Sequence, residues 1–398
     1  MLTVIGGTYV ELCREPEYEE LWGSGLRGAC ALADKGFKIQ FFSCIGKLEK
    51  PSVEHTCIAF GISPTWYMVD ETVIWNYYHP LAKPTAYSSV LVKDIVNLPN
   101  IEAETILYYG MIEATVKVKG AYIVYDPQNG KNFNSTGSTA EHLAIVLNKK
   151  EALLLSGMEA EDDLVKIGKH LLSKEKAEVV IIKNGSDGGI VVDHSGISAF
   201  PIFATETVWP IGSGDIFSAA FAWKWAIEKM PPRNAAYLAS QFTAQFCETK
   251  VLPLPLSPNL ASAIPIKAKK NFVYLAGPFF TIAERWLINE IRNALLDFDN
   301  EVFSPLHDVG VPACKSTVEI SQELASADLQ ALDKTNVLLA IASGNDVGTM
   351  IEIGYAIAKK KRIIVLAENL NPTDLTMLEG SNCIIVSDIS SAVYKASW

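Results

Sequence analysis

Several features that define familiar classes of protein are missing from this chain. Its 398 residues contain no C-x-x-C and no H-E-x-x-H motif, and the seven cysteines and six histidines are scattered. Their absence argues against a zinc site or a disulfide framework. Dispersed cysteines with apolar neighbours favour buried thiols in a reducing compartment.

Signals for membranes and nucleic acids are also missing. No apolar run approaches the length of a membrane span, and residues 1–7 lack the basic start and apolar core of a signal peptide. Acidic residues number 45 against 34 basic ones, the net charge is −11, and no basic stripe is present. We therefore expect a cytoplasmic protein that binds small molecules, with no nucleic-acid and no membrane partner.

The length of the chain predicts at least two domains. Residues 251–270 contain four prolines and no helical period, which is typical of a semi-rigid spacer. We place the first domain at residues 1–255, a linker at 256–270 and a second domain at 271–398.

The first domain alternates between strand and helix patterns, which predicts an α/β domain with a parallel sheet. Residues 66–92 are rich in aromatic residues and predict a small β lid apart from the main sheet. The expected strands of the main sheet are residues 2–6, 38–42, 105–109, 121–125, 152–155 and 179–182. The expected helices are residues 139–147 and 160–172.

The segment from Gly23 to Gly28 matches the dinucleotide-binding pattern G-x-G-x-x-G. That pattern requires a buried strand before it and an acidic residue after the next strand. Residues 17–22 do not form a buried-strand pattern, and Ser43 and Cys44 follow the next strand. The sequence therefore argues against a nucleotide-dependent dehydrogenase.

A second glycine-rich segment, Gly212-Ser213-Gly214-Asp215, opens an apolar helical pattern. Small residues at a helix N-terminus expose backbone amides that can bind an anion such as phosphate. An aspartate just inside the helix is placed to take a proton from a hydroxyl that attacks a phosphate. Alternatively, the segment is a plain turn and Asp215 is a charge that the helix dipole favours.

This segment resembles the second signature of the PfkB/ribokinase family of sugar and nucleoside kinases. Three further motifs occur in the family's order, namely Tyr125-Asp126-Pro127, Asn148-x-x-Glu151 and the turn from Lys183 to Gly189. The resemblance implies a ribokinase-like domain with ATP and Mg²⁺ as cofactors. It implies the following roles: Asp215 as catalytic base, Gly212, Ser213 and Gly214 as anion hole, Asn148, Glu151, Lys183 and Gly185 at the nucleotide, and Glu151 as an indirect Mg²⁺ contact.

The chain departs from this family at the sugar end of the site. The first signature appears as Gly23 to Cys30 without its asparagine, and Trp209 replaces the aspartate that opens the second signature. Two interpretations stay open: the domain phosphorylates an unusual acceptor, or it binds a nucleotide without transferring phosphate.

The second domain shows five apolar strand patterns with intervening helices, which predicts a doubly wound, flavodoxin- or Rossmann-like parallel sheet. The expected strands are residues 272–276, 301–303, 337–342, 362–367 and 383–386. Asn345 and Asp346 follow the third of these strands, and Glu352 lies one turn into the next helix. Paired carboxylates at the carboxyl end of a strand suit cleavage of a bond between a base and a sugar. Alternatively, Thr349-x-x-Glu352 is only a capping box.

Four ordered elements of this domain resemble the nucleoside 2-deoxyribosyltransferase family. They are residues 274–280, 301–305, 327–329 and 346–356. The resemblance implies Glu352 as the nucleophile that forms a glycosyl-enzyme, Tyr274 as its orienting group, and Asp346 and Asp328 as binders of the base that pass its proton. It implies a substrate pocket without a cofactor, at Gly277, Phe279, Phe280, Gly348 and Asn336.

Three details of this resemblance concern substrate and assembly. Asn336 stands where many relatives carry a second aspartate, so recognition of the base is expected to differ. Residues 374–377 loosely resemble the segment that reaches a neighbouring subunit in the family, which implies a homo-oligomer. Within the same resemblance, the turn after residue 276, which leads into the predicted pocket, favours nucleosides over nucleotides as substrates.

Three functions follow from these patterns. In the first, the second domain transfers or hydrolyses the sugar of 2′-deoxynucleosides, and the first phosphorylates a nucleoside or sugar. In the second, the first domain is a nucleotide-sensing pseudokinase that regulates a hydrolase depleting nucleosides or nucleotides. In the third, both sites are vestigial, but the intact Asp215, Asp346 and Glu352 count against it.

Overall fold

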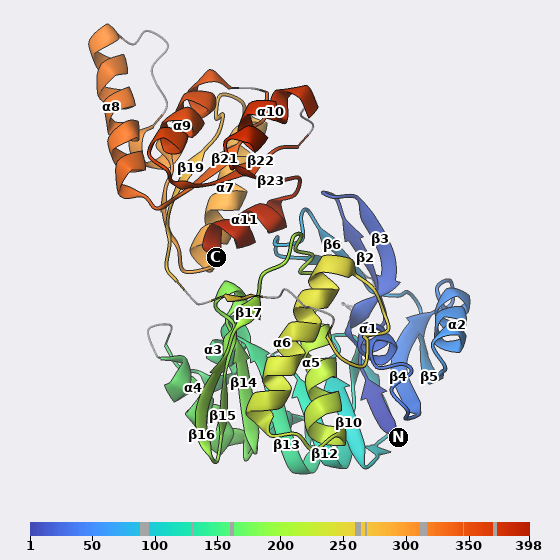
Figure 1. Cartoon of the computed structure of the whole chain (residues 1–398). Coiled ribbons are helices and arrows are strands. Elements are labelled where there is room, and N and C mark those ends of the chain that lie inside the picture. Colours follow the sequence, from blue (N-terminus) through green and yellow to red (C-terminus); the bar gives the residue numbers. More distant parts are fainter. Residues whose placement is uncertain are drawn as a thin grey trace. The chain divides into compact units, whose positions relative to one another are not determined.

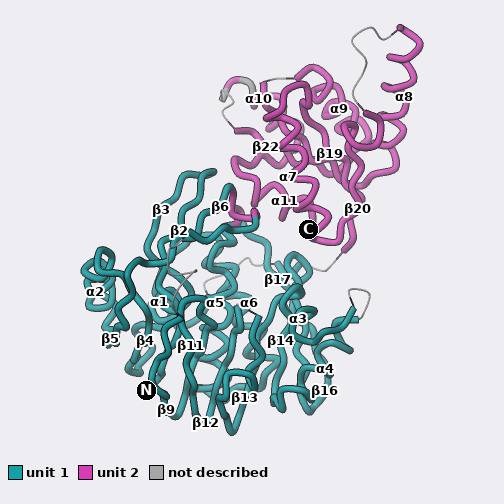
Figure 2. The backbone as a smooth tube through the Cα atoms, turned by 180° about the vertical axis from the view of Figure 1, so that it is seen from behind, with its two compact units in different colours: residues 1–78, 83–205, 209–266 teal, residues 79–82, 206–208, 267–398 magenta. Residues whose placement is uncertain are grey.

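The computed structural model describes residues 1–87, 95–128, 130–159, 163–258, 264–266, 269–310, 317–344, 346–368 and 372–398, without the side chains of Pro372 and Asp374. The chain divides into two units (Figure 2). Unit 1 contains residues 1–78, 83–205 and 209–266, and unit 2 contains residues 79–82, 206–208 and 267–398.

Unit 1 is built on a sheet in the order β16-β15-β14-β13-β12-β10-β1-β4-β5, with β9 paired to β12. Its neighbours from β5 to β14 are parallel, and β15 and β16 continue it in antiparallel fashion. The strands are β1 (Leu2–Ile5), β4 (Ile39–Gly46), β5 (Ile62–Val69), β9 (Ile101–Glu102), β10 (Thr105–Tyr109), β12 (Val118–Asp126), β13 (Thr139–Asn148), β14 (Val179–Lys183), β15 (Gly189–Asp193) and β16 (Gly196–Phe200).

Helices cover both faces of this sheet and bury an apolar core on each. The helices are α1 (Gly23–Ala31), α2 (Lys50–Ala59), α3 (Lys149–Ser156), α4 (Leu164–Glu175), α5 (Ser213–Phe221) and α6 (Pro232–Thr249). Side chains of α1, α2, α5 and α6 enter one core, and side chains of α3 and α4 enter the other. Helices α5 and α6 lie side by side across the sheet (Figure 1).

A separate four-stranded sheet in the order β3-β2-β6-β7 matches the small β structure expected beside the main sheet. Its strands are β2 (Tyr9–Cys13), β3 (Tyr18–Trp22), β6 (Ile74–Tyr77) and β7 (Thr85–Tyr87). Residues 66–69, expected in this sheet, instead belong to β5 at the edge of the main sheet, and residues 88–92 lie outside the described ranges. Two short pairs complete the unit: β8 (Val96–Asn97) with β11 (Ala114–Thr115), and β17 (Ile202–Phe203) with β18 (Pro265–Ile266).

Two predicted elements of unit 1 were wrong. Residues 139–147, predicted as a helix, form β13, and residues 152–155, predicted as a strand, lie in α3. Strand β13 lies between two parallel neighbours and is buried on both faces at its centre, so it lacks the alternation that marks a half-buried strand. The apolar run 152–155 follows the capping box of Asn148 and Glu151, which starts a helix.

Unit 2 is a five-stranded sheet in the order β20-β19-β21-β22-β23, and all of its neighbours are parallel. The strands are β19 (Phe272–Ala276), β20 (Glu301–Phe303), β21 (Val337–Ile341), β22 (Arg362–Leu366) and β23 (Ile384–Val386). Helices α7 (Ile282–Asp297) and α11 (Ile389–Ser397) cover one face. Helices α8 (Val318–Lys334), α9 (Val347–Ala358) and α10 (Pro372–Gly380) cover the other.

The strand order of unit 2 is 2-1-3-4-5 in chain order, the flavodoxin-like arrangement. This confirms the α/β class and the five-stranded, doubly wound sheet expected from the sequence. In such a sheet the strand order reverses beside the first strand, because the later strands are added on opposite sides of it. Ligands bind at that point, outside the carboxyl ends of the strands. In this unit that point lies beyond β19 and β21, where the loops leading to α7 and α9 begin.

Two expectations from missing sequence features concern thiols and membranes. Six cysteines are described as free thiols and five of them are buried, whereas Cys314 lies outside the described residues. Within the described ranges, none of the helices combines the length and apolar character that crossing a membrane requires.

Candidate active sites

The glycine-rich segment of unit 1 forms the N-terminus of α5, as expected for an anion site. Gly212 has a φ of +80°, and a Cβ on it would lie 2.3 Å from Nε of Arg27. Both the backbone conformation and this contact therefore disfavour any residue with a side chain. Ser213 begins the helix, and the Cβ position of Gly214 lies 3.2 Å from Nζ of Lys183. The backbone amides of this turn and the Lys183 ammonium are therefore close enough to act on one phosphate group.

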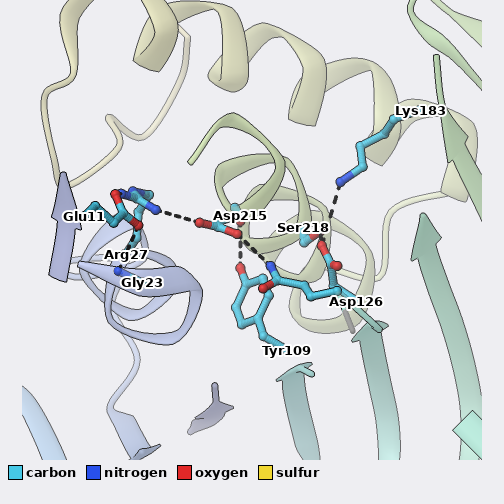
Figure 3. Close-up of polar contacts among 9 residues, drawn as sticks. Glu11, Gly23, Arg27, Tyr109, Asp126, Lys183, Asp215 and Ser218 are labelled. Carbon is cyan, nitrogen blue, oxygen red and sulfur yellow. Dashed lines mark hydrogen bonds and ion pairs between the residues drawn. The ribbon is translucent and has the colours of Figure 1, made fainter. Parts of the chain in front are cut away.

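Asp215 lies in the first turn of α5, and its carboxylate is held from two sides (Figure 3). Nη1 of Arg27 donates to Oδ2 at 2.7 Å, and Nε2 of Gln128 donates to Oδ1 at 2.8 Å. The Tyr109 hydroxyl donates to the Asp215 carbonyl at 2.6 Å, which fixes the turn. Each carboxylate oxygen of the predicted base thus already accepts a hydrogen bond.

Arg27 links three elements of unit 1 through a buried ion network. Its guanidinium pairs with Glu11 of β2 and with Asp215, and Glu11 also accepts the amide of Gly23 at 3.1 Å. The side chains of Arg27 and Glu11 are 3% and 5% exposed. Burial alone would lower the pKa of Arg27, but the charges of Glu11 and Asp215 raise it above its ordinary value. Arg27 therefore stays charged, and its two ion pairs tie the small sheet to α1 and α5.

A second polar group lies beside Asp215, at the carboxyl end of β12. Asp126 accepts a hydrogen bond from the Ser218 hydroxyl at 2.7 Å, and Nζ of Lys183 lies 3.7 Å from the same carboxylate oxygen. Burial raises the pKa of Asp126 to about 7, although the charge of Lys183 opposes the shift. Burial likewise raises the pKa of Glu151, again against the charge of Lys183. Asp126 can therefore exchange a proton near neutral pH.

Three residues assigned to the cofactor by resemblance, Asn148, Glu151 and Gly185, lie at or after the carboxyl ends of β13 and β14. Asn148 caps α3, and a carboxylate oxygen of Glu151 accepts the Asn148 amide at 2.8 Å. Gly185 starts a single turn of 3₁₀ helix after β14. Among the described residues no three His, Cys, Asp or Glu side chains are grouped to hold a metal ion. The Gly212–Gly214 turn and Lys183 fit a phosphate, whereas the Mg²⁺ contact of Glu151 stays a prediction.

These groups surround a cavity of about 350 Å³ that lies within unit 1. Its lining includes the predicted residues Asn148, Glu151, Lys183, Gly212, Gly214 and Asp215. It also includes residues to which the sequence assigned no role, among them Tyr9, Glu11, Ser24, Arg27, Trp75, Tyr77, Asp126 and Gln128. Most of the predicted site residues of the first domain therefore line one cavity.

The candidate site of unit 2 centres on a hydrogen bond between a strand of the sheet and a helix that packs on the sheet. The Tyr274 hydroxyl, from β19, donates to Oε1 of Glu352, from α9, at 2.6 Å. Tyr274 is fully buried and its ring stacks on Phe303 at 5.3 Å. Burial and the Glu352 charge raise the pKa of Tyr274, so its hydroxyl stays a proton donor in the hydrogen bond. Tyr274 therefore fixes the direction of the Glu352 carboxylate, the role predicted for it.

Two further carboxyls act on Glu352. Burial raises its pKa to about 7, the Tyr274 hydrogen bond lowers it, and the charges of Asp328 and Asp346 raise it again. Burial also raises the pKa of Asp328 to about 6, and its Oδ1 is buried without a hydrogen-bond partner among the described residues. The fold thus gathers the three predicted carboxyls, and Asp328 has an oxygen free to serve a ligand.

The helix cap at α9 decides the structural alternative raised for Glu352. Asp346 is the N-cap, and its Oδ2 accepts both the amide and the hydroxyl of Thr349 at 2.8 Å. Glu352 bonds to Tyr274 instead of reaching back to the start of the helix. Gly348 lies in the same turn, with its Cβ position 3.2 Å from Oδ2 of Asp346. The cap is therefore made by Asp346, which leaves Glu352 for the site.

The remaining predicted residues of unit 2 divide into two groups. Gly277 packs tightly against Ile288 and Ile341, and Phe279 and Phe280 stack on each other at 5.3 Å in the loop after β19. Asn336 lies apart from them, before the amino end of β21, where its Oδ1 accepts the amide of Phe272 at 2.8 Å and its Nδ2 donates to Asn271. The structure therefore does not bring Asn336 to the carboxyls, which lie toward the other end of the strands.

Two predicted positions lie outside what the structure describes. Asn345, at the head of the α9 turn, is outside the described residues, as is the side chain of Asp374. Met377, in the segment expected to meet another subunit, is 78% exposed.

Sequence reasoning missed three residues of the network around Asp215. Arg27 and Gln128 bond to its carboxylate, and Glu11 pairs with Arg27. Glu11 carries a signal that could have been found, since it sits at an inward position of the alternating strand 9–13. A carboxylate is rarely buried without a partner, so this position predicts a buried cation close to Glu11. Arg27 stands inside the glycine-rich α1, but no local pattern joins it to residue 215.

Comparison with protein families places both domains in known enzyme classes. Residues 112–252 match the model of the family described as pfkB family carbohydrate kinase. Residues 273–385 match the model of the family described as nucleoside 2-deoxyribosyltransferase. The chain therefore joins a kinase-family domain to a deoxyribosyltransferase-family domain, which confirms the two resemblances stated from the sequence.

Among solved structures, the chain is similar to several kinases. A pyrophosphate-dependent kinase of the ribokinase family has 16% identity and a TM-score of 0.45, with 64% of this chain and 97% of that chain covered. Ribokinase of Thermotoga maritima has 16% identity and a TM-score of 0.44, with 64% and 96% covered. Phosphofructokinase-2 of Escherichia coli has 13% identity and a TM-score of 0.44, with 64% and 94% covered.

One curated relative is an uncharacterized protein of Ureaplasma parvum serovar 3. It is 28% identical over 110 residues, which cover 24% of this chain and 65% of that protein. The match thus spans slightly less than two thirds of the relative's length.

Proposed function

We propose that the second domain cleaves the N-glycosidic bond of 2′-deoxynucleosides through a glycosyl-enzyme at Glu352. The observation that carries this proposal is the 2.6 Å hydrogen bond by which buried Tyr274 holds Glu352. The match of residues 273–385 to the deoxyribosyltransferase family supports the substrate class. The gathering of Asp328 and Asp346 around Glu352 supports the chemistry.

The proposed reaction has two steps. An ionised oxygen of Glu352 attacks C1′, the bond between C1′ and the base breaks, and a proton passes from Asp328 to the leaving nitrogen. A second base or water then attacks C1′ from the opposite face, releases Glu352 and gives its proton to Asp328. The raised pKa of Asp328, about 6, supports this exchange. Two displacements at C1′ retain its configuration.

The experiment that tests this proposal is product analysis after incubation with deoxyadenosine and free cytosine, without ATP. We expect adenine to appear, accompanied by deoxycytidine if bases are exchanged or by free deoxyribose if water is the acceptor. Either product pair establishes cleavage and tells transferase from hydrolase. Absence of adenine under these conditions contradicts the proposal.

For the first domain we propose phosphorylation of a nucleoside or sugar hydroxyl, with Asp215 as the base. ATP, with Mg²⁺, supplies the transferable phosphoryl group when it is bound. The amides of Gly212–Gly214 and the Lys183 ammonium would hold the phosphates, as their closeness supports. Asp215 would accept the proton of the attacking hydroxyl.

Replacing Asp215 with Asn should abolish ATP consumption while leaving ATP binding within a few fold. Loss of a general base lowers turnover by about 10²- to 10⁴-fold, but the amide keeps the shape of the turn. The measurement is ADP formation with deoxyadenosine or deoxyribose as acceptor, beside ATP binding by calorimetry. Asp70→Asn, at an exposed position, is the matched control. Unchanged ADP formation in Asp215→Asn rules out the base assignment.

A second candidate function for this domain is supported by one observation. Both carboxylate oxygens of Asp215 already accept hydrogen bonds, from Arg27 and Gln128. A carboxylate whose two oxygens already accept hydrogen bonds is less available to an attacking hydroxyl, which suits a domain that binds a nucleotide and regulates its neighbour. In that case the wild-type chain binds ATP but forms no ADP with any acceptor. The oligomeric state stays a prediction in both cases.

A further inference from the structure

The unit 1 cavity has an aromatic wall that the phosphate-handling groups do not explain. Tyr9 comes from β2, and Trp75 and Tyr77 come from the adjacent β6, so the small sheet supplies all three. The rings of Tyr9 and Trp75 meet edge to face at 6.3 Å. Aromatic side chains in a cavity of about 350 Å³ offer stacking surfaces for a planar ring.

The same cavity contains a hydroxyl that lacks a partner. Ser24 is 4% exposed, and its Oγ is buried without a hydrogen bond among the described residues. It precedes Gly25, whose Cβ position lies 2.5 Å from the backbone of Gly6, so α1 is pressed against β1 and cannot shift freely. Leaving such a hydroxyl unsatisfied is unfavourable, which suits a site that meets a hydroxyl or ring nitrogen of a ligand.

The charges around the cavity exclude an anionic acceptor. Glu11 and Asp215 face the single guanidinium of Arg27, and Asp126 and Glu151 face the single ammonium of Lys183. Even with the last two carboxyls protonated, Glu11 and Asp215 still balance both cations. No positive charge is then left over for the phosphate of a nucleotide acceptor in addition to the phosphate donor.

We propose that the acceptor held in this cavity is an uncharged nucleoside, with its base against Trp75 and Tyr77 and a hydroxyl on Ser24. This inference rests on the proposed kinase-type site of the first domain and names its substrate class. A free sugar lacks the planar base that would stack on the aromatic wall. A nucleoside 5′-monophosphate brings charge that the wall cannot neutralise.

The test is calorimetric binding to the full-length Glu352→Ala chain, in the absence of ATP. This variant retains the second domain but cannot consume the probe. We expect two molecules of deoxyadenosine per chain, one for each domain. Trp75→Leu in the same background should weaken the first-domain site by roughly tenfold or more, because stacking of a base is lost. Tyr87→Leu, an exposed position of the same sheet that does not line the cavity, should change neither site.

A second variant protects the test against misfolding of Trp75→Leu. Ser24→Ala removes only the hydroxyl and should weaken the same site by about threefold to tenfold. Deoxyribose and deoxyadenosine 5′-monophosphate are the comparison probes, and both should bind the Trp75-dependent site at least about tenfold more weakly than deoxyadenosine.

Three results would overturn the inference. They are equal stoichiometry and affinity in the Trp75→Leu and Ser24→Ala chains, equal affinity for deoxyribose, or equal affinity for the monophosphate at the Trp75-dependent site. Because binding is measured without turnover, an absence of phosphorylation or cleavage in the wild-type chain counts against the proposed function alone.

Discussion

Glu352→Gln should lower the rate of base release from deoxyadenosine by about 10³-fold or more. The amide keeps the size of the side chain and can still accept the Tyr274 hydroxyl, but it cannot form a covalent bond to C1′. The measurement is adenine release followed by chromatography. Glu301→Gln, an exposed glutamate at the amino end of β20, is the matched control and should keep full activity.

The pKa of Glu352 gives this prediction a second readout. Because Glu352 titrates near 7 in the folded protein, the wild-type rate should rise as the pH rises through about 7. The ordinary pKa of the group is 4.5, so the folded state takes up a proton between that value and about 7 and loses stability as the pH rises through this window. Glu352→Gln removes that loss and should melt no lower than wild type above neutral pH. If Glu352→Gln cleaves deoxyadenosine at the wild-type rate, Glu352 has only a structural role.

Arg27→Met should lower the free energy of unfolding of unit 1 by about 3 to 5 kcal/mol. The substitution leaves Glu11 and Asp215 buried without the cation that both of them bind, and the side chain of Glu11 is only 5% exposed. Denaturant unfolding followed by tryptophan fluorescence measures this effect, since six of the eight tryptophans lie in unit 1.

The control for this prediction is Arg14→Met, an exposed arginine at the end of β2, which should change the stability by less than about 0.5 kcal/mol. Adding Glu11→Gln to Arg27→Met removes one uncompensated charge and should recover part of the lost stability. If Arg27→Met unfolds at the same denaturant concentration as wild type, Arg27 is not the cation that balances the two carboxylates.

The grouping of Tyr274, Asp328, Asp346 and Glu352 was implied by the family resemblance, whereas the α/β class and the second domain's strands were predicted from sequence patterns. The strands were predictable because a strand buried in a parallel sheet appears in the sequence as a short apolar run. The carboxyl ends of such strands meet at one edge of the sheet. Residues 139–148 show where this method fails. A strand covered on both faces carries no alternation, so only its pairing with β12 and β14 distinguishes it from a helix.

Asn336 shows a second limit. Its position just before a strand was compatible with a place in the pocket by resemblance. The direction of β21 puts it toward the other end of the sheet from Glu352, where it bonds to Asn271 and to the Phe272 amide. Sequence gives the order of residues along a strand, but the end that carries the site depends on where neighbouring loops converge.

The sequence by itself determined the two enzyme families and the positions of the glycine-rich turn and of the carboxyls. These features are local, because each depends on residue types within one turn or one loop. Only the tertiary structure decided that Arg27 and Gln128 hold Asp215, that Glu11 pairs with Arg27, and that Trp75 and Ser24 line the same cavity. These residues come from β2, α1, the segment after β12, β6 and α5. Contacts over such separations depend on the packing of whole elements, which no short pattern in the chain encodes.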